Sequence, residues 1–263
     1  MSRPADTDVK RYPGFNLFLG LFFVYLYLPI AVLVFYSFND SKLASIWGGF
    51  SLRWYASALQ NRNLLDAVSN SLTVAAVATF FAVVIALLAA LVLVRGQGVK
   101  RRKLSETVIN LPLLLPEVVL AVAVLILFSS LGMQNGMLKL MIAHTTFCTP
   151  FAFLPIRARL QGMTLDLEEA AQDLYATPWT TFRRVTFPAI APGVFAGAML
   201  AFVMSMDDFI TSMMLNGGGA TTLPVYIFSL IRSGVSPELN AISTLIILVS
   251  LLFGAVAVAL QRN

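Results

Sequence analysis

Three acidic residues lie inside long apolar stretches of this 263-residue chain: Glu117, Asp207 and Asp208. A carboxylate at bilayer depth costs roughly 2.5 kcal/mol or more, so it usually faces a partner or a wet pathway. No lysine or arginine stands at a matching depth, so the sequence offers no obvious internal partner. Because unpaired carboxylates along a pathway favour cations, the three acids are candidates for a substrate pathway that carries cations.

Each of these acids also has a structural interpretation. Glu117 follows Pro116, so it could be a neutral or hydrogen-bonded residue at a break in a helix. Asp207 and Asp208 could form structural hydrogen bonds or pair with another subunit. Adjacent side chains on a helix point about 100° apart, so these two cannot both face one pore squarely. The pathway and the structural interpretations both stay open on these residues alone.

Catalytic chemistry has few candidate residues in this sequence. No G-x-x-x-x-G-K-[ST] loop occurs, so we do not expect the chain to bind or hydrolyse ATP. His144 and Cys148 are the sole histidine and cysteine, and for them we expect packing and hydrogen bonding rather than a metal site. We therefore predict no catalytic residue, no metal ligand and no cofactor, although serine or aspartate catalysts with other bases stay formally open.

A second feature is the polar stretch DLEEAAQDLYATPWTTFRRVTFP, residues 166–188, between apolar segments. Its first half predicts a helix with Asp166 as N-cap and Glu169 completing a capping-box-like pair. Its second half predicts a helix with Thr177 as N-cap and Pro178 in the first turn, ended by Pro188. The stretch therefore reads as a short helix–turn–helix, which could lie on lipid headgroups or dock a soluble partner.

The composition places these features in a membrane protein. Hydrophobic residues make up 58% of the chain, charged residues 12%, and the mean hydropathy is +0.82, whereas soluble domains carry about a quarter charged residues. The first apolar segment is too long for a cleaved signal sequence, so we predict that it is a retained span. The net charge of +5 follows from membrane topology and does not indicate nucleic-acid binding.

We predict an all-α, polytopic fold with six transmembrane helices in a single transmembrane domain, residues 1–263. With the N-terminus cytoplasmic, 13 of the 18 lysines and arginines fall inside, which agrees with the positive-inside rule. Both termini are then cytoplasmic, and a cytoplasmic loop spans residues 161–189. The predicted spans, each long enough for a bilayer crossing, are residues 15–38, 68–94, 104–131, 137–160, 190–215 and 239–260.

The cytoplasmic loop resembles the EAA loop of permease subunits of bacterial ABC importers. That pattern is Glu-Ala-Ala, three residues, Gly, nine residues, Ile, one residue, Leu-Pro. The one substantial departure is a tyrosine at the glycine position, so we expect the turn or its fit to a partner to differ slightly. The matching residues, which the resemblance implies couple the chain to a separate ATPase, are Glu169, Ala170, Ala171, Tyr175, Val185, Phe187 and Pro188.

Further stretches are similar to putrescine/spermidine permeases of that family, nearest to the putrescine type, and the likeness runs from about Phe15 to Ala259. They are Ser205–Ala241, Tyr36–Leu43 and Ala143–Phe151. The resemblance implies a type I importer fold and polyamine translocation across the bacterial inner membrane. It also implies contact with lipid and three protein partners: a second permease subunit, an ATPase dimer that binds ATP and Mg, and a periplasmic polyamine-binding protein.

Two other functions are weighed against this one. The chain could be the permease of an importer for another small solute, such as an amino acid, iron or an oxyanion, although intramembrane acids argue against anions. It could also be a secondary transporter or a cation channel that works alone, although the EAA spacing argues against this. The sequence does not choose between putrescine and spermidine.

Overall fold

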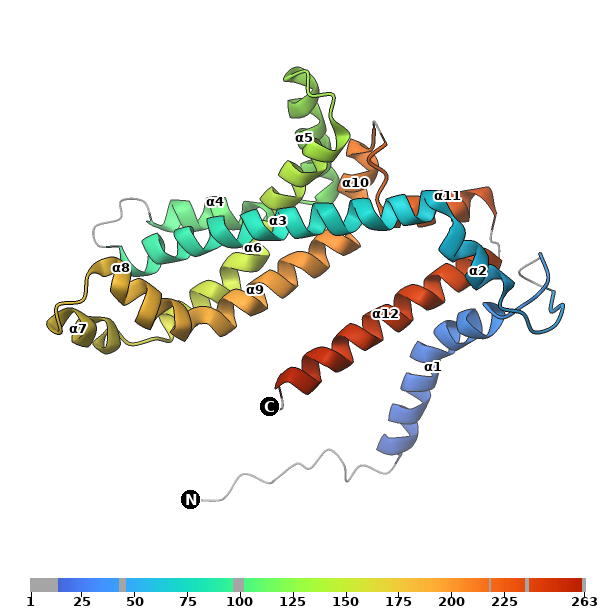
Figure 1. The fold of residues 1–263 in the computed structure, drawn as a ribbon, viewed down its shortest axis with the longest axis horizontal. Helices are drawn as coiled ribbons and strands as arrows, with labels where there is room; N and C mark the ends of the chain where they lie inside the picture. The colour runs from blue at the N-terminus through green and yellow to red at the C-terminus, as the bar shows by residue number, and fades with distance from the viewer. Residues whose placement is uncertain (1–13, 43–45, 97–101, 218, 235–236, 262–263) are drawn as a thin grey trace. The chain divides into compact units, whose positions relative to one another are not determined.

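The computed structural model describes residues 14–42, 46–96, 102–217, 219–234 and 237–261 (Figure 1). Within these ranges the regular elements are helices, and Asn39 and Phe50 form an isolated β-bridge. The residues group into two compact units, Met1–Arg62 with Ile227–Asn263, and Asn63–Tyr226. The single transmembrane domain stays a prediction, and the cytoplasmic ends predicted for the chain, residues 1–13 and 262–263, lie outside the described residues.

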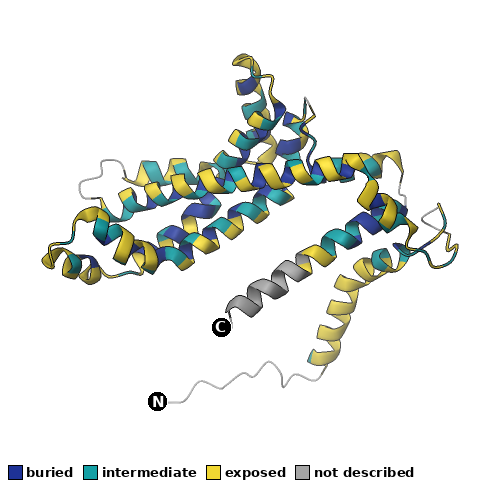
Figure 2. Ribbon diagram, viewed as in Figure 1, coloured by how far each residue is buried: buried dark blue, intermediate teal, exposed yellow. Residues whose placement is uncertain are grey.

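The first unit contains α1 (Phe15–Tyr36), α2 (Arg53–Gln60) and α12 (Pro237–Gln261), with α1 and α2 both in contact with α12. None of the residues of α1 is buried, as expected of a helix that faces lipid (Figure 2). The loop after α1 is organised by Asn39, whose side-chain amide donates to the Ile46 carbonyl at 2.7 Å. Its side-chain oxygen accepts from the backbone N–H of Gly48 at 2.8 Å.

The second unit contains the remaining helices as far as Tyr226 in α11, packed through small residues. Four alanines of α3, spaced four residues apart, are fully buried: Ala78, Ala82, Ala86 and Ala90. Gly197 of α9 lies so close to α6 that a Cβ there would sit 2.6 Å from the Ala152 carbonyl oxygen. Small residues permit such close approach of membrane helices. The helices are α3 (Arg62–Arg95), α4 (Arg102–Leu114), α5 (Glu117–Ser130), α6 (Gly136–Gln161), α7 (Asp166–Asp173), α8 (Pro178–Thr181), π-helix η2 (Phe182–Thr186), α9 (Phe187–Asp207), α10 (Ile210–Leu215) and α11 (Leu223–Ser233).

Four helical stretches of the described chain are long and apolar enough to cross a bilayer: Phe15–Tyr36, Arg62–Arg95, Gly136–Gln161 and Pro178–Asp207. The predicted third span is not one straight helix, because α4 and α5 meet at a bend of 105°. Pro116 stands at this bend in an extended conformation, with φ −57° and ψ 132°. Pro112, by contrast, lies inside α4, so only one of the two prolines in the predicted third span lies at the bend. The count of six stays a prediction.

The helical stretch that contains most of the predicted fifth span, residues 190–215, runs from Pro178 to Asp207. The boundaries of the span itself stay a prediction. The expectation that Pro188 would end the preceding helix is wrong, since helical structure continues through η2 into α9. A proline ring clashes with the carbonyl four residues earlier in a regular α-helix, and the wider π turn directly before Pro188 gives that ring room.

Candidate functional site

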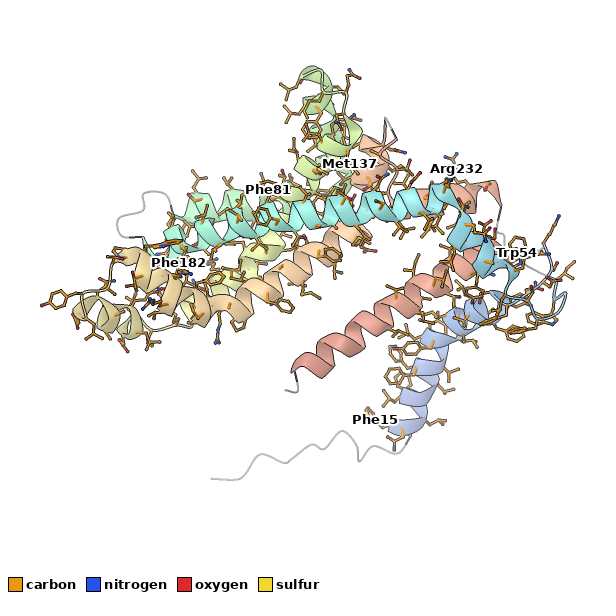
Figure 3. All side chains as sticks on the ribbon, viewed as in Figure 1. Phe15, Trp54, Phe81, Met137, Phe182 and Arg232 are labelled. Carbon is orange, nitrogen blue, oxygen red and sulfur yellow. The ribbon has the colours of Figure 1, made fainter. Side chains whose placement is uncertain are left out.

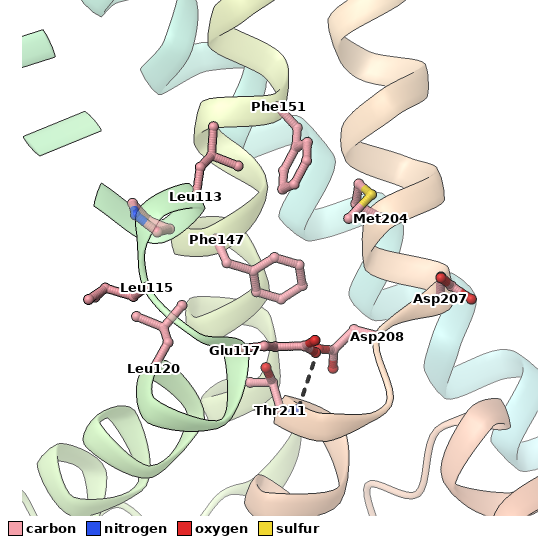
Figure 4. A pocket seen from close by; sticks show the side chains of 11 residues that line it. Leu113, Leu115, Glu117, Leu120, Phe147, Phe151, Met204, Asp207, Asp208 and Thr211 are labelled. Carbon is pink, nitrogen blue, oxygen red and sulfur yellow. Dashed lines mark hydrogen bonds between the residues drawn. The ribbon is translucent and has the colours of Figure 1, made fainter. Parts of the chain in front are cut away.

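A cavity of about 250 Å³ opens in the second unit where α5, α6, α9 and α10 approach one another. The bend between α4 and α5 and the break between α9 and α10 place short extended segments at its wall (Figure 4). Irregular backbone at membrane depth is tolerated where it lines a cavity. The lining residues are Pro112, Leu113, Leu115, Glu117, Leu120, Phe147, Phe151, Met204, Asp207, Asp208 and Thr211.

Glu117 is brought into this cavity by the bend. It is the first residue of α5, directly after Pro116, and its side chain is exposed. The N-terminus of a helix stabilises a negative charge because the free backbone N–H groups carry partial positive charge. Figure 4 shows its carboxyl group pointing toward that of Asp208, with which it interacts.

Asp208 occupies the break between α9 and α10, with an extended backbone at φ −64° and ψ 116°. Its Oδ2 accepts hydrogen bonds from the backbone N–H of Ser212 at 2.8 Å and from the Ser212 hydroxyl at 2.9 Å. Asp208 precedes the N-cap residue Phe209, and its carboxylate accepts from backbone N–H groups in the first turn of α10. The predicted fifth span, residues 190–215, is therefore not one continuous helix, because α9 ends at Asp207 and α10 begins at Ile210.

The expectation that the intramembrane acids lack an internal partner was wrong for Asp208. His144 Nε2 lies 3.3 Å from Asp208 Oδ2, and the two side chains are 1% and 2% exposed. The other ring nitrogen of His144, Nδ1, is 2.8 Å from the Ser205 hydroxyl. The packing and hydrogen-bonding role expected for His144 is confirmed, but its pairing with Asp208 was missed because only Lys and Arg were considered as partners.

Asp207 is arranged differently from its neighbour. It is the last residue of α9, it is exposed, and in Figure 4 its carboxylate points away from those of Glu117 and Asp208. The wall nevertheless includes all three acids, together with the aromatic rings of Phe147 and Phe151. No lysine or arginine is among the described lining residues. The arrangement suits a cation with an apolar body. The carboxylates attract its charge, and the aromatic rings can contact both its charged group and its apolar part.

The EAA-like residues lie on the short helix α7, in the turn after it, in η2 and at the start of α9. Glu169 and Ala170 are exposed on α7, and Ala171 is partly exposed. On the second side, Val185 lies in η2, and Phe187 and Pro188 form the first turn of α9. Large apolar side chains beside them are exposed to solvent, among them Leu174 and Trp179. Exposed apolar surface of this kind marks an interaction site.

Tyr175, at the position where the EAA pattern has glycine, adopts a backbone conformation typical of glycine. It has a positive φ of 60°, the left-handed conformation that glycine adopts most readily. The backbone N–H of Tyr175 bonds to Gln172 O at 2.9 Å and that of Ala176 to Ala171 O at 3.1 Å. These two bonds form a Schellman motif that ends α7. The tyrosine thus adopts the turn that a glycine would make, and its ring, 97% exposed, points into solvent.

The capping predictions for the two short helices have different outcomes. Asp166 is the first residue of α7 rather than its N-cap, which is Leu165 without a side-chain cap. Thr177 is confirmed as the N-cap of α8, since its hydroxyl accepts from the Thr180 backbone N–H, and Pro178 is confirmed in the first turn. The acids at the start of α7 still face the positive end of its dipole.

Sequence reasoning missed one further acid of this segment, Glu168. Its Oε2 lies 3.1 Å from Arg95 Nε at the end of α3, and its Oε1 accepts a hydrogen bond of 2.8 Å from the Thr186 hydroxyl. No signal in the local pattern separates Glu168 from the neighbouring Glu169. The difference arises only when α3 and η2 are packed beside α7.

Known proteins share both the sequence pattern and the fold. Residues 82–263 match the family described as binding-protein-dependent transport system inner membrane component. The chain belongs to this family. The putrescine transport system permease protein PotI of Escherichia coli (strain K12) is 41% identical over 248 residues, which cover 92% of this chain and 88% of PotI.

A second relative supports the same membership, and a solved structure has the same fold. The spermidine/putrescine transport system permease protein PotC of Escherichia coli (strain K12) is 35% identical over 246 residues, covering 94% of this chain and 93% of PotC. A chain from the crystal structure of a bacterial ABC transporter involved in the import of the acidic polysaccharide alginate superposes with a TM-score of 0.74. It covers 98% of this chain and 99% of its own length at 15% identity, so it supports the type I importer permease fold alone.

Proposed function

We propose that this chain is the transmembrane permease subunit of an ATP-driven importer that moves putrescine or spermidine across the bacterial inner membrane. The observation that carries the proposal is the cavity lined by Glu117, Asp207 and Asp208 beside two phenylalanines. A polyamine is an extended chain of methylenes between ammonium groups. Carboxylates suit its charges, and the apolar wall suits its methylenes. The relatives with polyamine substrates in their names support the same substrate class.

Transport by this chain would require several partners. A second, homologous permease subunit would complete the pathway, and a periplasmic polyamine-binding protein would deliver the substrate. An ATPase dimer would bind ATP and Mg and dock on the exposed faces of α7 and α8, where Glu169, Leu174 and Trp179 lie. Both ends of the chain would then be cytoplasmic, on the same side as the ATPase.

The chain's own residues have two tasks in such a mechanism of alternating access. Closure of the ATPase dimer would move α7 and α8, and the spans connected to them would then open the cavity to the loaded binding protein. The acids of the cavity would hold the polycation while the surrounding helices change sides. ATP hydrolysis would return the helices to their starting positions.

Uptake of radiolabelled putrescine by cells that carry the complex as their sole polyamine importer tests this proposal. Glu117→Gln keeps the size of the side chain and removes its charge from the cavity. We expect the KM for uptake to rise about tenfold, the effect of losing one favourable charge contact of about 1.4 kcal/mol. The matched control is Asp66→Asn, which neutralises an exposed acid of α3 that does not line the cavity. Equal uptake by the two variants would contradict a role for Glu117 in the pathway.

A further inference from the structure

Glu168 differs from the rest of helix α7. It is the one buried residue among the eight of this helix, whereas the adjacent Glu169 is exposed. A carboxylate is rarely buried unless a charged or hydrogen-bonded partner compensates for the lost water. Its environment therefore indicates a specific partner within the chain.

The two carboxylate oxygens of Glu168 engage two different elements. Oε2 lies 3.1 Å from Nε of Arg95, the last residue of α3, and Oε1 accepts a 2.8 Å hydrogen bond from the hydroxyl of Thr186, the last residue of η2. Arg95 also donates from Nη2 to the Met163 carbonyl at 3.1 Å, in the segment that leads into α7. The ion pair joins the end of α3 to α7. The two hydrogen bonds add the segment before α7, through Met163, and the segment after it, through Thr186.

This ion pair is shielded from solvent. The side chains of Arg95 and Glu168 are 19% and 11% exposed. Salt screens partly buried pairs much less than exposed ones, so the attraction persists at cytoplasmic ionic strength. A displacement of α7 that left α3 in place would separate the two charges, and such a displacement is therefore opposed.

Thr186 connects the same carboxylate to the acidic cavity. It ends η2, whose first residue, Phe182, is labelled in Figure 3. Helical structure then runs on without interruption through α9 to Met204 and Asp207, which line the cavity. Isolated π turns within α-helices occur frequently at functional sites. The hydrogen bond from Thr186 therefore joins Glu168 to the helix that reaches the cavity.

We propose that Glu168 is a positioning residue that transmits the movement of helix α7 to two membrane helices, to α3 through Arg95 and to α9 through Thr186. The adjacent Glu169 faces outward and is available to the ATPase. This inference rests on the proposed function, in which α7 contacts the ATPase. The two adjacent acids thus have different roles, since Glu169 faces the ATPase and Glu168 faces the membrane helices.

The test compares Glu168→Gln with wild type in the complete complex, reconstituted in proteoliposomes with its binding protein. Glutamine keeps the size and the acceptor for Thr186 but removes the charge opposite Arg95. We expect the number of radiolabelled putrescine molecules imported per ATP hydrolysed to fall at least about tenfold, because the change leaves the Arg95 charge without its partner. The ATPase should stay bound, because Glu169 is intact. Asp173→Asn, which neutralises an exposed acid of the same helix, should leave the ratio unchanged.

Two further variants keep the inference testable if Glu168→Gln fails to assemble. Thr186→Val removes the hydroxyl and leaves the ion pair, and we expect it to lower the transport-to-ATP ratio about threefold, in keeping with the loss of one hydrogen bond. Thr186→Ser retains the hydroxyl and should match wild type. Arg95→Gln combined with Glu168→Gln should be no worse than either single change, because both remove the same pair.

A purely structural role has a different signature. It would lower the amount of complex recovered while the recovered complex kept the wild-type ratio of putrescine to ATP, and this result would overturn the inference. A wild-type complex that hydrolyses ATP without importing putrescine would overturn the proposed substrate instead. The inference is then judged by whether Glu168→Gln abolishes the stimulation of ATP hydrolysis by the binding protein. A wild-type chain that binds no ATPase would overturn both.

Discussion

Two pairs of adjacent acids lie in different regions of the second unit. Asp207 and Asp208 lie at the cavity, and Glu168 and Glu169 lie on helix α7. In each pair one carboxylate is buried against a partner from a distant part of the chain, and the other is exposed. Asp208 is held by His144, and Glu168 is held by Arg95.

The comparison teaches that neighbouring identical side chains can have separate tasks. The buried member needs its partner, because an uncompensated buried charge is costly. The exposed member has no such requirement and can contact something outside the chain. Substitutions at the buried members should therefore change stability or coupling, whereas substitutions at the exposed members should change binding with little change in stability.

The largest effect is expected for Asp208→Ala. The change removes the carboxylate beside His144 Nε2 and the acceptor of the first N–H groups of α10, so we expect a loss of about 3 kcal/mol in the free energy of unfolding. The midpoint of thermal unfolding of the purified complex in detergent measures this loss. Asp207→Ala is the matched control, and we expect it to change stability by less than about 0.5 kcal/mol. Equal destabilisation by both variants would break the comparison.

The next effect concerns the exposed acid of the coupling pair. Glu169→Lys reverses the charge that, in the proposed function, faces the ATPase, so we expect the ATPase to bind about tenfold more weakly, an effect of about 1.4 kcal/mol. Co-purification of the ATPase with the permease across a concentration series measures the affinity. The thermal midpoint of the permease itself should stay at the wild-type value. Normal ATPase binding together with normal coupled uptake would contradict the placement of Glu169 at this interface.

Much of this arrangement follows from local sequence signals. Long apolar runs locate the membrane helices, and the spacing from Glu169 to Pro188 predicts a segment that couples to an ATPase. The acids Glu117, Asp207 and Asp208 stand out by their polarity alone, and the structure places all three at one cavity. These predictions depend on residue type and spacing, which the chain carries before it folds.

Other features depend on contacts between distant segments. The pairs His144–Asp208 and Arg95–Glu168 join different helices, so no local pattern indicates them. The sharp bend falls at Pro116, whereas Pro112, Pro150 and Pro155 lie inside continuous helices. Neighbouring helices can satisfy the backbone groups that a proline frees, so packing decides which proline breaks a span.

A smaller effect should sharpen the comparison at the cavity. Ser205→Ala removes the hydroxyl that contacts His144 Nδ1 at 2.8 Å and leaves the Asp208 contact in place. We expect a loss of about 1 kcal/mol in the free energy of unfolding, the usual net value of one buried hydrogen bond. Thermal unfolding measures it, with Ser233→Ala as a control, since the hydroxyl of Ser233 is exposed and contacts only its own helix. A loss as large as that of Asp208→Ala would place the main support of the site on Ser205.

The smallest effect is expected at Tyr175, where backbone strain and exposed surface meet in one residue of the coupling segment. A non-glycine residue in the left-handed conformation destabilises the folded state by roughly 1–2 kcal/mol. A glycine removes this strain, but it loses more conformational freedom on folding, which lowers stability by roughly 0.5–1 kcal/mol. Tyr175→Gly should therefore raise the free energy of unfolding by about 0.75 kcal/mol, within a range of roughly 0–1.5 kcal/mol. Tyr175→Ala separates the two contributions, because it removes the exposed ring and keeps the strained backbone. If the ring contacts the ATPase, both variants weaken ATPase binding and glycine alone stabilises the permease; stabilisation by alanine as well would assign the strain to the ring and not to the backbone.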